Sequence, residues 1–486
     1  MEKTSLAPLL AAAIPALAAA LIYVTRERPN LREACSVAAA ALQFLVVLSM
    51  VPPVLDGNTL HVTLSSFIPQ VSIAFRADAL GLLFAGTASF LWLLTTVYSI
   101  GFLRSLGARG QTRYYAAFAI ALSATMGIAF SANLFTLYLF YEALTFITYP
   151  LVTHAQTGEA YAAGKRYLQY HLATSIAFLL PAIIVTFALA DTFDFRPGGV
   201  FPAGTGSTGL VVAYVLFLLG ATKAAIMPLH LWLPGAMVAP VPVSALLHAV
   251  AVVNAGVFLM LRVILDVFGV ELMDELDLGT ATAVVVSLTV VLATVYAYRL
   301  DSLKAVLAYS TISNLSLMIL GVALLDRQAM TGGVMHLVNH SLAKITLFFC
   351  VGSILISTGK TKISELNGIG RRLPWTMGAF TVGALGIVGI PPTAGFVTKY
   401  YLAIGMIDAK HVPFLLVLFL STLVSAGYYL RILRAAFFDS GQEDPAPQAK
   451  DPRRLIVAPL VVTAALSLVI GIYPSLVLEL VDEALP

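Results

Sequence analysis

The sequence predicts an all-α membrane protein that crosses the bilayer many times, and three observations lead to this fold class. Hydrophobic residues make up 59% of the 486 residues and charged residues only 11%, whereas a soluble domain carries about a quarter charged residues. The mean hydropathy is +0.92. Apolar segments of about 20 residues recur along the chain, which suits membrane-spanning helices rather than the shorter strands of a barrel. We therefore expect one membrane domain over residues 1–486.

The apolar segments divide the chain into about fourteen predicted spans. These spans lie at 5–24, 34–53, 79–103, 114–131, 133–153, 165–190, 210–227, 241–265, 278–298, 303–325, 329–356, 375–405, 411–436 and 455–478. If both termini lie outside, the Lys and Arg residues of the inner loops outnumber those of the outer loops, where Arg262 is counted, by about three to one. We therefore expect a multi-pass protein of the cell (inner) membrane with both termini outside.

Two segments between spans have a character of their own. Residues 56–76 alternate apolar and polar side chains (HVTLSSF, VSIAF), which predicts a small hairpin on the outer face. Residues 437–454 form a predicted cytoplasmic linker before the last helix, 455–478, and its residues 439–454 are polar (DSGQEDPAPQAKDPRR). A mobile loop and a docking strip are both open interpretations of this linker.

The seventh predicted span is interrupted by proline. The stretch 220–248 carries Lys223 and four prolines, of which Pro228 comes first. Proline removes a helical hydrogen bond and clashes with the preceding turn. In lipid, a broken helix is tolerated only where it packs in protein or lines a wet cavity. The sequence therefore predicts a break at Pro228, shortly after Lys223.

The twelfth predicted span carries a second break. Pro391 and Pro392 interrupt it shortly before Lys399. The two breaks are five spans apart, an odd number, so the two halves are predicted to be inverted relative to each other. We expect five-helix repeats at about 112–265 and about 277–436.

Four ionisable side chains fall well inside the predicted spans: Glu142, Lys223, Lys344 and Lys399. Placing an ionisable side chain inside a membrane costs free energy, so such residues usually have a function. Burial disfavours the charged forms of Glu142 and Lys223, and pairing opposes that effect. We expect these two residues to be partners, either as a proton switch or as a static salt bridge. Lys304 stands at the inner mouth of the tenth span, either inside it or among the headgroups.

Histidines accompany these charges. His336, His340 and Lys344 are spaced four residues apart, so they form one polar stripe along a helix. Histidine titrates near neutral pH, which suits a proton relay. The alternatives are interhelical hydrogen bonding without transport, and metal binding, which we do not expect because no carboxylate or cysteine completes the ligand set. His248 is a candidate bridge between the halves. The sequence assigns no role to His171 and His230.

The sequence offers no active site of its own. It contains no glycine-rich phosphate loop, no nucleophile elbow and no Cys-x-x-Cys motif, so we expect no cofactor and no metal. Cys35 and Cys350 lie inside apolar segments and are interpreted as packing residues. The net charge of +3 gives no reason to expect nucleic acid as a partner.

Six stretches together resemble one family. They are FYEALTFITYPLV, GATKAAIMPLHLWLP, PVPVSALLHAVAVVNAGVFLMLR, DSLKAVLAYSTISNLSLM, HLVNHSLAKITLFF and GIPPTAGFVTKYYL. The chain is similar to the antiporter-like membrane subunits shared by respiratory complex I, Mrp-type cation/proton antiporters and membrane-bound hydrogenases. The resemblance implies fourteen helices with two inverted five-helix repeats. It also implies a central proton-transfer axis that consists of Glu142, Lys223, His248, Lys304, His336, His340, Lys344 and Lys399.

The chain departs from the family pattern at three positions. Asn254 stands where many relatives have a lysine, which leaves His248 as the nearer link between the halves. Gly235 and Met237 replace an acidic residue and a histidine after the WLP motif. These two residues are expected to tune packing at the break rather than to conduct protons.

The sequence therefore predicts a proton-translocating, antiporter-like subunit of a larger membrane complex. Its expected partners are other membrane subunits, the lipid bilayer and protons, with Na⁺ as a further coupling ion left open. The Mrp antiporter, hydrogenase and complex I types are not separated by the motifs. A non-conducting scaffold of a redox complex and a stand-alone secondary solute transporter are the alternatives.

Overall fold

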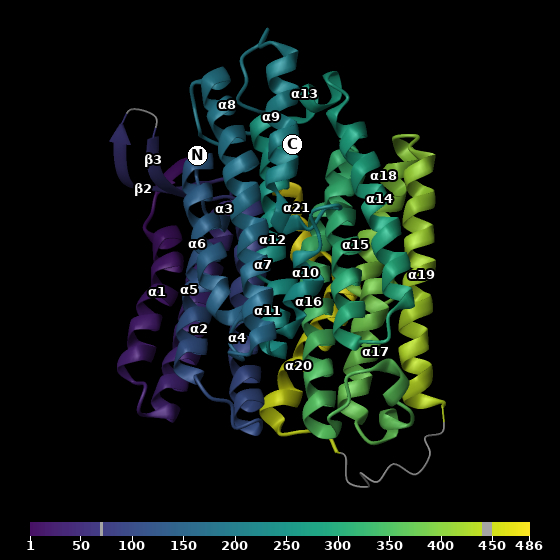
Figure 1. The fold of residues 1–486 in the computed structure, drawn as a ribbon. Helices are drawn as coiled ribbons and strands as arrows, with labels where there is room; N and C mark the ends of the chain where they lie inside the picture. The colour runs from purple at the N-terminus through teal and green to yellow at the C-terminus, as the bar shows by residue number, and fades with distance from the viewer. Residues whose placement is uncertain (69–70, 440–449) are drawn as a thin grey trace.

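Long, roughly parallel helices make up almost all of the structure (Figure 1). The computed structural model describes residues 1–68, 71–439 and 450–486. Within these residues, eleven helices are long and apolar enough to cross a membrane. The two chain termini lie at the same end of the bundle (Figure 1). The predicted fold class, an all-α polytopic membrane protein, is confirmed.

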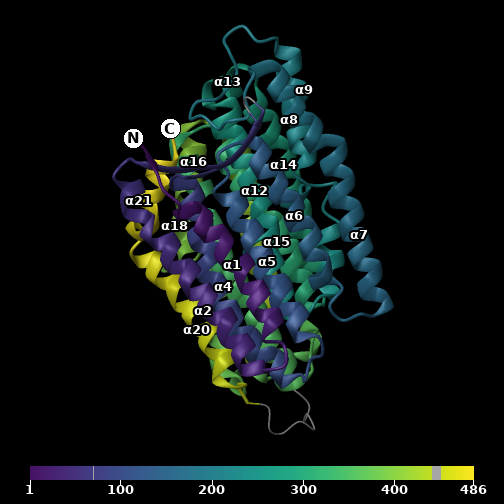
Figure 2. The same ribbon diagram turned by 90° about the vertical axis from the view of Figure 1, so that its left-hand side faces the viewer.

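The first part of the chain forms the elements on one side of the bundle. They are β1 (Glu2–Thr4), α1 (Ala7–Val24), α2 (Pro29–Ser49), α3 (Val51–Leu55), β2 (Thr59–Ile68), β3 (Val71–Ala77), α4 (Ala79–Ser105), α5 (Gln111–Ala129), α6 (Leu134–Val152), α7 (Gly158–Thr174), the π-turn η1 (Ser175–Leu179), α8 (Leu180–Ala190) and α9 (Ser207–Gly220). In the view of Figure 2, α7 and α20 (Arg454–Ile472) lie at opposite edges of the bundle.

The middle and the end of the chain complete it. The middle contains η2 (Thr222–Ala224), α10 (Trp232–Gly235), η3 (Ala236–Val238), α11 (Val241–Ala249), α12 (Val252–Arg262), the π-turn η4 (Val263–Phe268), α13 (Val270–Glu275), α14 (Leu278–Arg299) and α15 (Leu303–Ala323). The end contains α16 (Arg327–Thr358), η5 (Ile363–Glu365), η6 (Ile369–Arg371), α17 (Pro374–Val388), α18 (Ala394–Asp408), α19 (Val412–Phe437), α20 and α21 (Ser475–Ala484).

The expected hairpin is present as β2 and β3, which pair antiparallel. The N-terminal strand β1 adds to β2 in parallel, which the sequence pattern did not predict. This small sheet lies at the end of the bundle where both termini lie (Figure 1). The predicted linker at 437–454 falls largely on residues 440–449, which are outside the described residues.

The number of membrane crossings stays a prediction. The eleven apolar helices account for most of the predicted spans. The remaining predicted spans, at 114–131, 210–227 and 375–405, fall on α5, on α9, and on α17 with α18. These helices are shorter or less apolar than the eleven.

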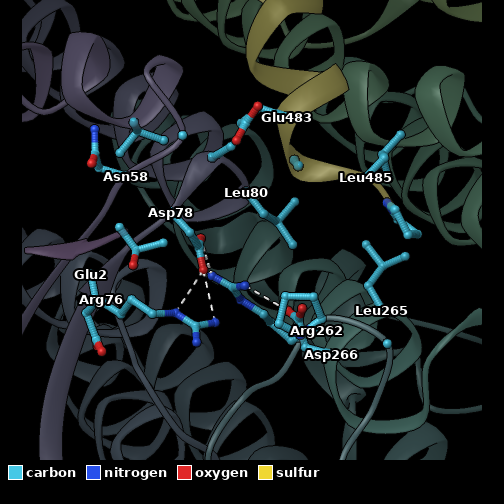
Figure 3. Close-up of a pocket in the computed structure, with 18 residues that line it drawn as sticks. Glu2, Asn58, Arg76, Asp78, Leu80, Arg262, Leu265, Asp266, Glu483 and Leu485 are labelled. Atoms are coloured by element: carbon cyan, nitrogen blue, oxygen red, sulfur yellow. Dashed lines mark hydrogen bonds and ion pairs between the residues drawn. The ribbon is translucent and has the colours of Figure 1, made fainter.

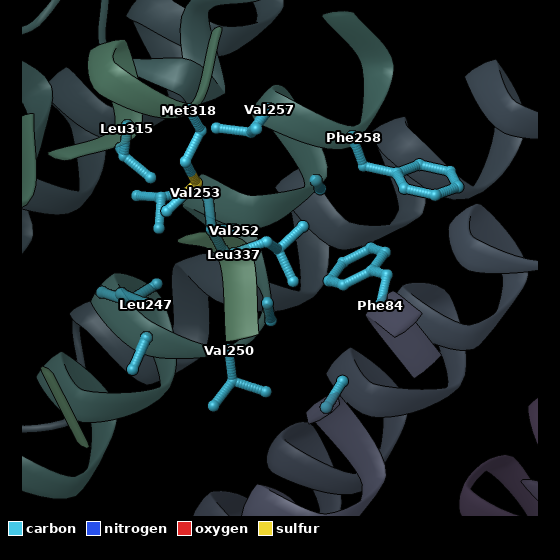
Figure 4. Close-up of a cluster of buried hydrophobic side chains, with 14 of the residues drawn as sticks. Phe84, Leu247, Val250, Val252, Val253, Val257, Phe258, Leu315, Met318 and Leu337 are labelled. Carbon is cyan, nitrogen blue, oxygen red and sulfur yellow. The ribbon is translucent and has the colours of Figure 1, made fainter. Parts of the chain in front are cut away.

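The core is built around α16, whose residues 329–354 are all buried. This helix packs against α4, α11, α15, α17, α18 and α20. A cluster of apolar side chains fills the space where α4, α12, α15 and α16 meet (Figure 4). Its members include Phe84, Phe258, Met318 and Leu337, all of them almost inaccessible to solvent. Polar groups in this region therefore have only protein groups or internal water as partners.

Candidate functional site

The first helix break lies earlier in the chain than predicted. Helix α9 ends at Gly220, so Lys223 lies in the short turn η2 rather than in a helix that continues to Pro228. The backbone cannot continue as a helix because Ala225 has the left-handed φ of 55°. The turn lies directly against α12, where a Cβ on Gly256 would be 2.1 Å from the nitrogen of Ala224.

Lys223 is completely buried at this break. Its Nζ donates to the Thr145 hydroxyl at 2.6 Å and to the Tyr141 carbonyl at 3.1 Å. The same Nζ lies 3.4 Å from the centroid of the Tyr141 ring, a cation–π geometry. All of these groups are neutral, and all belong to α6.

Glu142 does not form the direct pair with Lys223 that the sequence suggested. No nitrogen–oxygen contact within 4.0 Å joins the two side chains. Instead, the Glu142 carboxylate accepts a hydrogen bond of 2.6 Å from the Ser175 hydroxyl. Tyr141 and Thr145 share one face of α6, and Glu142 points about 100° away from that face. The two charges still interact electrostatically across this gap.

His248 lies where the eighth predicted span is interrupted. The sequence predicted a continuous span at 241–265, but α11 ends at Ala249 and α12 begins at Val252. The carbonyls of the last helical turn therefore lack helical partners. The Nε2 of His340 lies 3.2 Å from the His248 carbonyl oxygen, and Asn254 Nδ2 donates to the Ala249 carbonyl at 3.0 Å.

Asn254, which replaces the family lysine, also connects α12 to α16. Its Nδ2 donates to the Ser341 hydroxyl at 2.9 Å, and the residue is fully buried. The ring of His248 packs 5.0 Å from the ring of Phe348. Neither ring nitrogen of His248 has a hydrogen-bond partner in the described residues.

The predicted stripe on α16 is buried along its whole length. His336, His340 and Lys344 are each fully inaccessible, and the two histidine rings lie 6.3 Å apart. His336 is held from both sides, with Nδ1 3.0 Å from the Thr398 hydroxyl and Nε2 3.0 Å from Asn314 Oδ1.

Two further lysines bind carbonyl oxygens. Lys344 donates to the Leu307 carbonyl at 3.2 Å. Lys304 lies in the first turn of α15 and is partly buried. It donates to the carbonyls of Met237 and Ala239, which follow the first break. Of the two locations open from the sequence, the structure therefore places the Lys304 amine inside the protein, near the first break.

The second break places Lys399 in the same kind of surroundings as Lys223. Helix α17 ends at Val388, and α18 begins beyond the two prolines. Lys399 Nζ donates to the Val388 carbonyl at 2.9 Å and to the Thr422 hydroxyl at 2.8 Å. Gly389 has a φ of 85° and lies against the Lys399 side chain, because a Cβ added at this glycine would be 2.7 Å from Lys399 Cδ. At each break, a lysine therefore donates hydrogen bonds to one backbone carbonyl and one threonine hydroxyl.

The sequence missed an ion cluster at the end of the bundle that holds both termini (Figure 3). Arg262, predicted to lie in an outer loop, is 2% exposed at the end of α12. It forms ion pairs with Asp78 at 2.6 Å and Asp266 at 2.7 Å, and Arg76 joins Asp78 at 3.1 Å. These residues line a cavity of about 430 Å³. The only sequence signal was the four-residue spacing of Arg262 and Asp266.

Other predicted residues lie outside this axis. His230 is partly buried and lines a separate surface cavity of about 520 Å³ with Tyr309. His171 packs against Trp232 beside the first break. No group of three or more His, Cys, Asp or Glu side chains that could hold a metal occurs in the described residues.

Known proteins resemble the chain over nearly its whole length. It is 29% identical to NADH-quinone oxidoreductase subunit N of Desulforudis audaxviator over 92% of this chain and 89% of that protein. It is 26% identical to a Na⁺/H⁺ antiporter subunit of Bacillus subtilis over 97% of this chain and 94% of that protein.

Two solved structures share the fold. A chain of the Mrp complex from Dietzia sp. DQ12-45-1b superposes with a TM-score of 0.87 at 22% identity, over 99% of this chain and 97% of that chain. A chain of an archaeal membrane-bound sulfane sulfur reductase superposes equally well at 24% identity, with the same coverage of both chains. Residues 131–425, which are more than half of the chain and include all eight residues of the predicted axis, match the sequence pattern of one family. The chain belongs to the family described as the NADH:quinone oxidoreductase/Mrp antiporter transmembrane family.

Proposed function

We propose that this chain is a proton-translocating subunit of a multisubunit membrane complex, of the Mrp cation/H⁺ antiporter type or the NADH:quinone oxidoreductase type. The names of its relatives support membership of such a complex. The proposed proton path follows the residues that cross the centre of the bundle, namely Glu142, Lys223, His248, Lys304, His340, His336, Lys344 and Lys399.

The observation that carries this proposal is the chemistry around three lysines, of which Lys223 and Lys344 are fully buried and Lys399 is partly buried. Lys223, Lys344 and Lys399 each bind neutral oxygens, and none has a carboxylate within 4.0 Å in the described part of the chain. A static salt bridge would need such a carboxylate. An amine held only by neutral acceptors can gain or lose a proton without leaving a buried counter-charge behind. These lysines are therefore suited to exchanging protons.

The ends of the path support the presence of neighbouring subunits. Glu142 and Lys399 are partly exposed, whereas the residues between the two breaks, such as His248 and Lys344, are fully buried. A charged group on the membrane face of a lone chain would meet lipid at a high cost. Partner subunits that cover the two ends would remove this cost. In the same proposal both termini lie on the outer side of a cell membrane.

The gap between Glu142 and Lys223 suggests how the path is driven. When the carboxylate approaches, it stabilises the charged form of Lys223; when it withdraws, that form loses this stabilisation. The proton then moves toward the second half by way of the rings of His248 and His340. Both ring nitrogens of His248, and Nδ1 of His340, are buried without a hydrogen-bond partner in the described residues. In the second half, Lys344 and Lys399 receive the proton.

The test is a substitution of Lys344 in the assembled complex. Lys344→Met keeps the length and the apolar stem of the side chain but holds no proton. We expect proton-linked activity in inverted vesicles to fall about a hundredfold, the effect typical of removing a positioned proton carrier. The control is Lys410→Met, at an exposed position of the loop before α19.

Two outcomes would contradict the proposal. Unchanged proton-linked activity in Lys344→Met and Lys399→Met would favour a non-conducting scaffold. Full activity of the purified chain without partner subunits would favour a stand-alone transporter. Replacing Na⁺ by a larger organic cation in the same vesicles shows whether Na⁺ is the exchanged ion.

A further inference from the structure

His171 lies in the last turn of α7, buried between α6 and the first break, with 2% of its surface exposed. Its Nδ1 is 2.8 Å from the carbonyl oxygen of Tyr167. A carbonyl oxygen can only accept, so Nδ1 carries the hydrogen and Nε2 presents a lone pair. This Nε2 is buried and has no hydrogen-bond partner among the described residues.

The surroundings hold this imidazole in place. Its ring packs edge-on against Trp232 at a centroid distance of 4.4 Å and lies 4.3 Å from the ring of Tyr167. The indole of Trp232 is itself fixed, because its Nε1 donates to the carbonyl of Thr222 at 3.0 Å. Thr222 directly precedes Lys223 in the turn η2, and α7 packs against this turn.

Ser175, which lies on the same helix face as His171, connects this region to Glu142. Ser175 follows His171 by four residues, so the two side chains lie on one face across the junction of α7 and η1. The Ser175 hydroxyl donates to the Glu142 carboxylate at 2.6 Å. The segment 171–175 therefore contacts Glu142 through Ser175 and the turn of Lys223 through His171 and Trp232.

The hydroxyl of Tyr141, whose ring contacts Lys223, is also buried without a partner in the described residues. Buried polar atoms are ordinarily satisfied by internal water. Water that satisfies Tyr141 and His171 Nε2 would connect the lysine to the imidazole, as proton transfer requires. The titratable groups around His171 are Tyr167 of its own helix, whose ring lies 4.3 Å away, and Lys223 of the neighbouring turn η2. On α6, Tyr141 contacts Lys223 and Glu142 contacts Ser175.

We propose that His171 is a further proton carrier of this chain, acting between Lys223 and the carboxylate of Glu142. Nε2 of His171 takes up a proton on the Glu142 side, and the ring becomes an imidazolium. Nε2 then gives this proton to the neutral amine of Lys223, which becomes charged, while His171 returns to the neutral form. This inference rests on the proposed proton-translocating function and adds a carrier that neither the sequence pattern nor the resemblance assigned.

The test compares two amide variants with wild type in the assembled complex in proteoliposomes. His171→Asn keeps a donor for the Tyr167 carbonyl, and His171→Gln places an amide near the position of Nε2; neither side chain can carry a proton. We expect the maximal rate of proton-linked activity to fall about tenfold or more. The cation concentration for half-maximal rate stays unchanged. The control is His154→Asn, a buried histidine near the end of α6 that is not part of the proposed path.

Each outcome decides the inference. Wild-type maximal rates in both amide variants overturn it, while an equal loss in His154→Asn points to a general effect of losing histidine. If neither amide variant assembles, the imidazole is required for packing and the inference is also overturned. The Lys344→Met variant in the same assay separates the two proposals. If Lys344→Met abolishes activity and the His171 variants do not, only the assignment of His171 fails.

Discussion

The imidazole of His340 donates a hydrogen bond from Nε2 to the backbone carbonyl oxygen of His248, 3.2 Å away. The carbonyl is free because α11 ends one residue later, at Ala249. The helix interruption therefore creates the contact between α11 and the histidine stripe of α16. Nδ1 of His340 is buried and has no partner in the described residues, so it presents a second, open position on the ring.

Asn254 should matter for stability because it satisfies the neighbouring free carbonyl. In Asn254→Ala, the Ala249 carbonyl and the Ser341 hydroxyl lose their donor in a fully buried place. We expect a loss of about 1–3 kcal/mol in the free energy of unfolding, measured by denaturation of the solubilised complex. Ser287→Ala is the matched control, because the Ser287 hydroxyl is buried without a partner in the described residues. An equal effect of both substitutions would contradict the assigned role of Asn254.

Gly256 allows the turn that carries Lys223 to lie against α12. A Cβ at this position would lie 2.1 Å from the nitrogen of Ala224 and 2.4 Å from the carbonyl carbon of Lys223, so the backbone must shift. We expect Gly256→Ala to destabilise the protein by about 1–3 kcal/mol, as overpacking does. Proton-linked activity should fall with it because Lys223 leaves the Thr145 hydroxyl.

The control for this substitution is Gly378→Ala. Gly378 lies within α17, and a Cβ there would meet nothing within 4 Å. Alanine also favours a helix over glycine, by about 1 kcal/mol. Gly378→Ala should therefore leave activity unchanged and stability unchanged or higher. Normal activity in Gly256→Ala would show that the turn η2 can move without consequence.

The sequence predicts the fold class and the unusual polar residues, because both depend on local composition. An apolar chain with prolines beside Lys223 and Lys399 must bury those lysines in interrupted helices whatever the detailed packing. The hairpin was predictable for the same reason, since alternation of side chains is a local signal.

The contacts of these residues depend on packing that no local signal reports. The interruption after His248 occurs in a run of Ala and Val without proline or glycine, so nothing in the chain marks it. Glu142 and Lys223 are the natural pair by charge. The rotation of α6 about its axis instead turns Thr145 toward Lys223, which donates a hydrogen bond to the threonine hydroxyl. Arg262 looks like a loop arginine until the opposite charges of Asp78 and Asp266 are seen beside it.

Removing the charge of Arg262 should lower the free energy of unfolding strongly. Arg262→Met removes the cation that Asp78 and Asp266 share, and it leaves Asp78 with Arg76 alone. Breaking a buried ion pair in this way costs about 3–5 kcal/mol, and we expect a loss of that size in unfolding free energy. Asp266→Asn in the same chain should recover part of it, because one uncompensated charge is removed.

The exposed pair of Arg434 and Asp439 provides the comparison. Arg434→Gln should change the unfolding free energy by less than about 1 kcal/mol, because water screens the pair. If Arg262→Met cost no more than Arg434→Gln, the cluster in Figure 3 would not hold the end of α12 in place.

Phe258 should keep the charged cavity and the central axis apart. It lies on α12 one turn beyond Asn254 and one turn before Arg262. Its ring is 5.1 Å from that of Phe84, and the two rings lie side by side in Figure 4. The Arg262 guanidinium lies 5.0 Å from the centroid of the Phe258 ring. An apolar constriction of this kind excludes water and therefore protons.

A polar substitution should open this barrier, and an apolar one should not. We expect Phe258→Asn to raise the passive proton leak of vesicles that contain the complex, because the amide stabilises water between the cavity and Asn254. Phe258→Leu also removes volume, but an apolar cavity stays dry, so its leak should match wild type. Both variants lose stability, with about 3 kcal/mol or more expected for the asparagine. The comparison of leaks therefore isolates hydration from packing. Equal leaks in the two variants would show that the barrier between the cavity and the axis lies elsewhere.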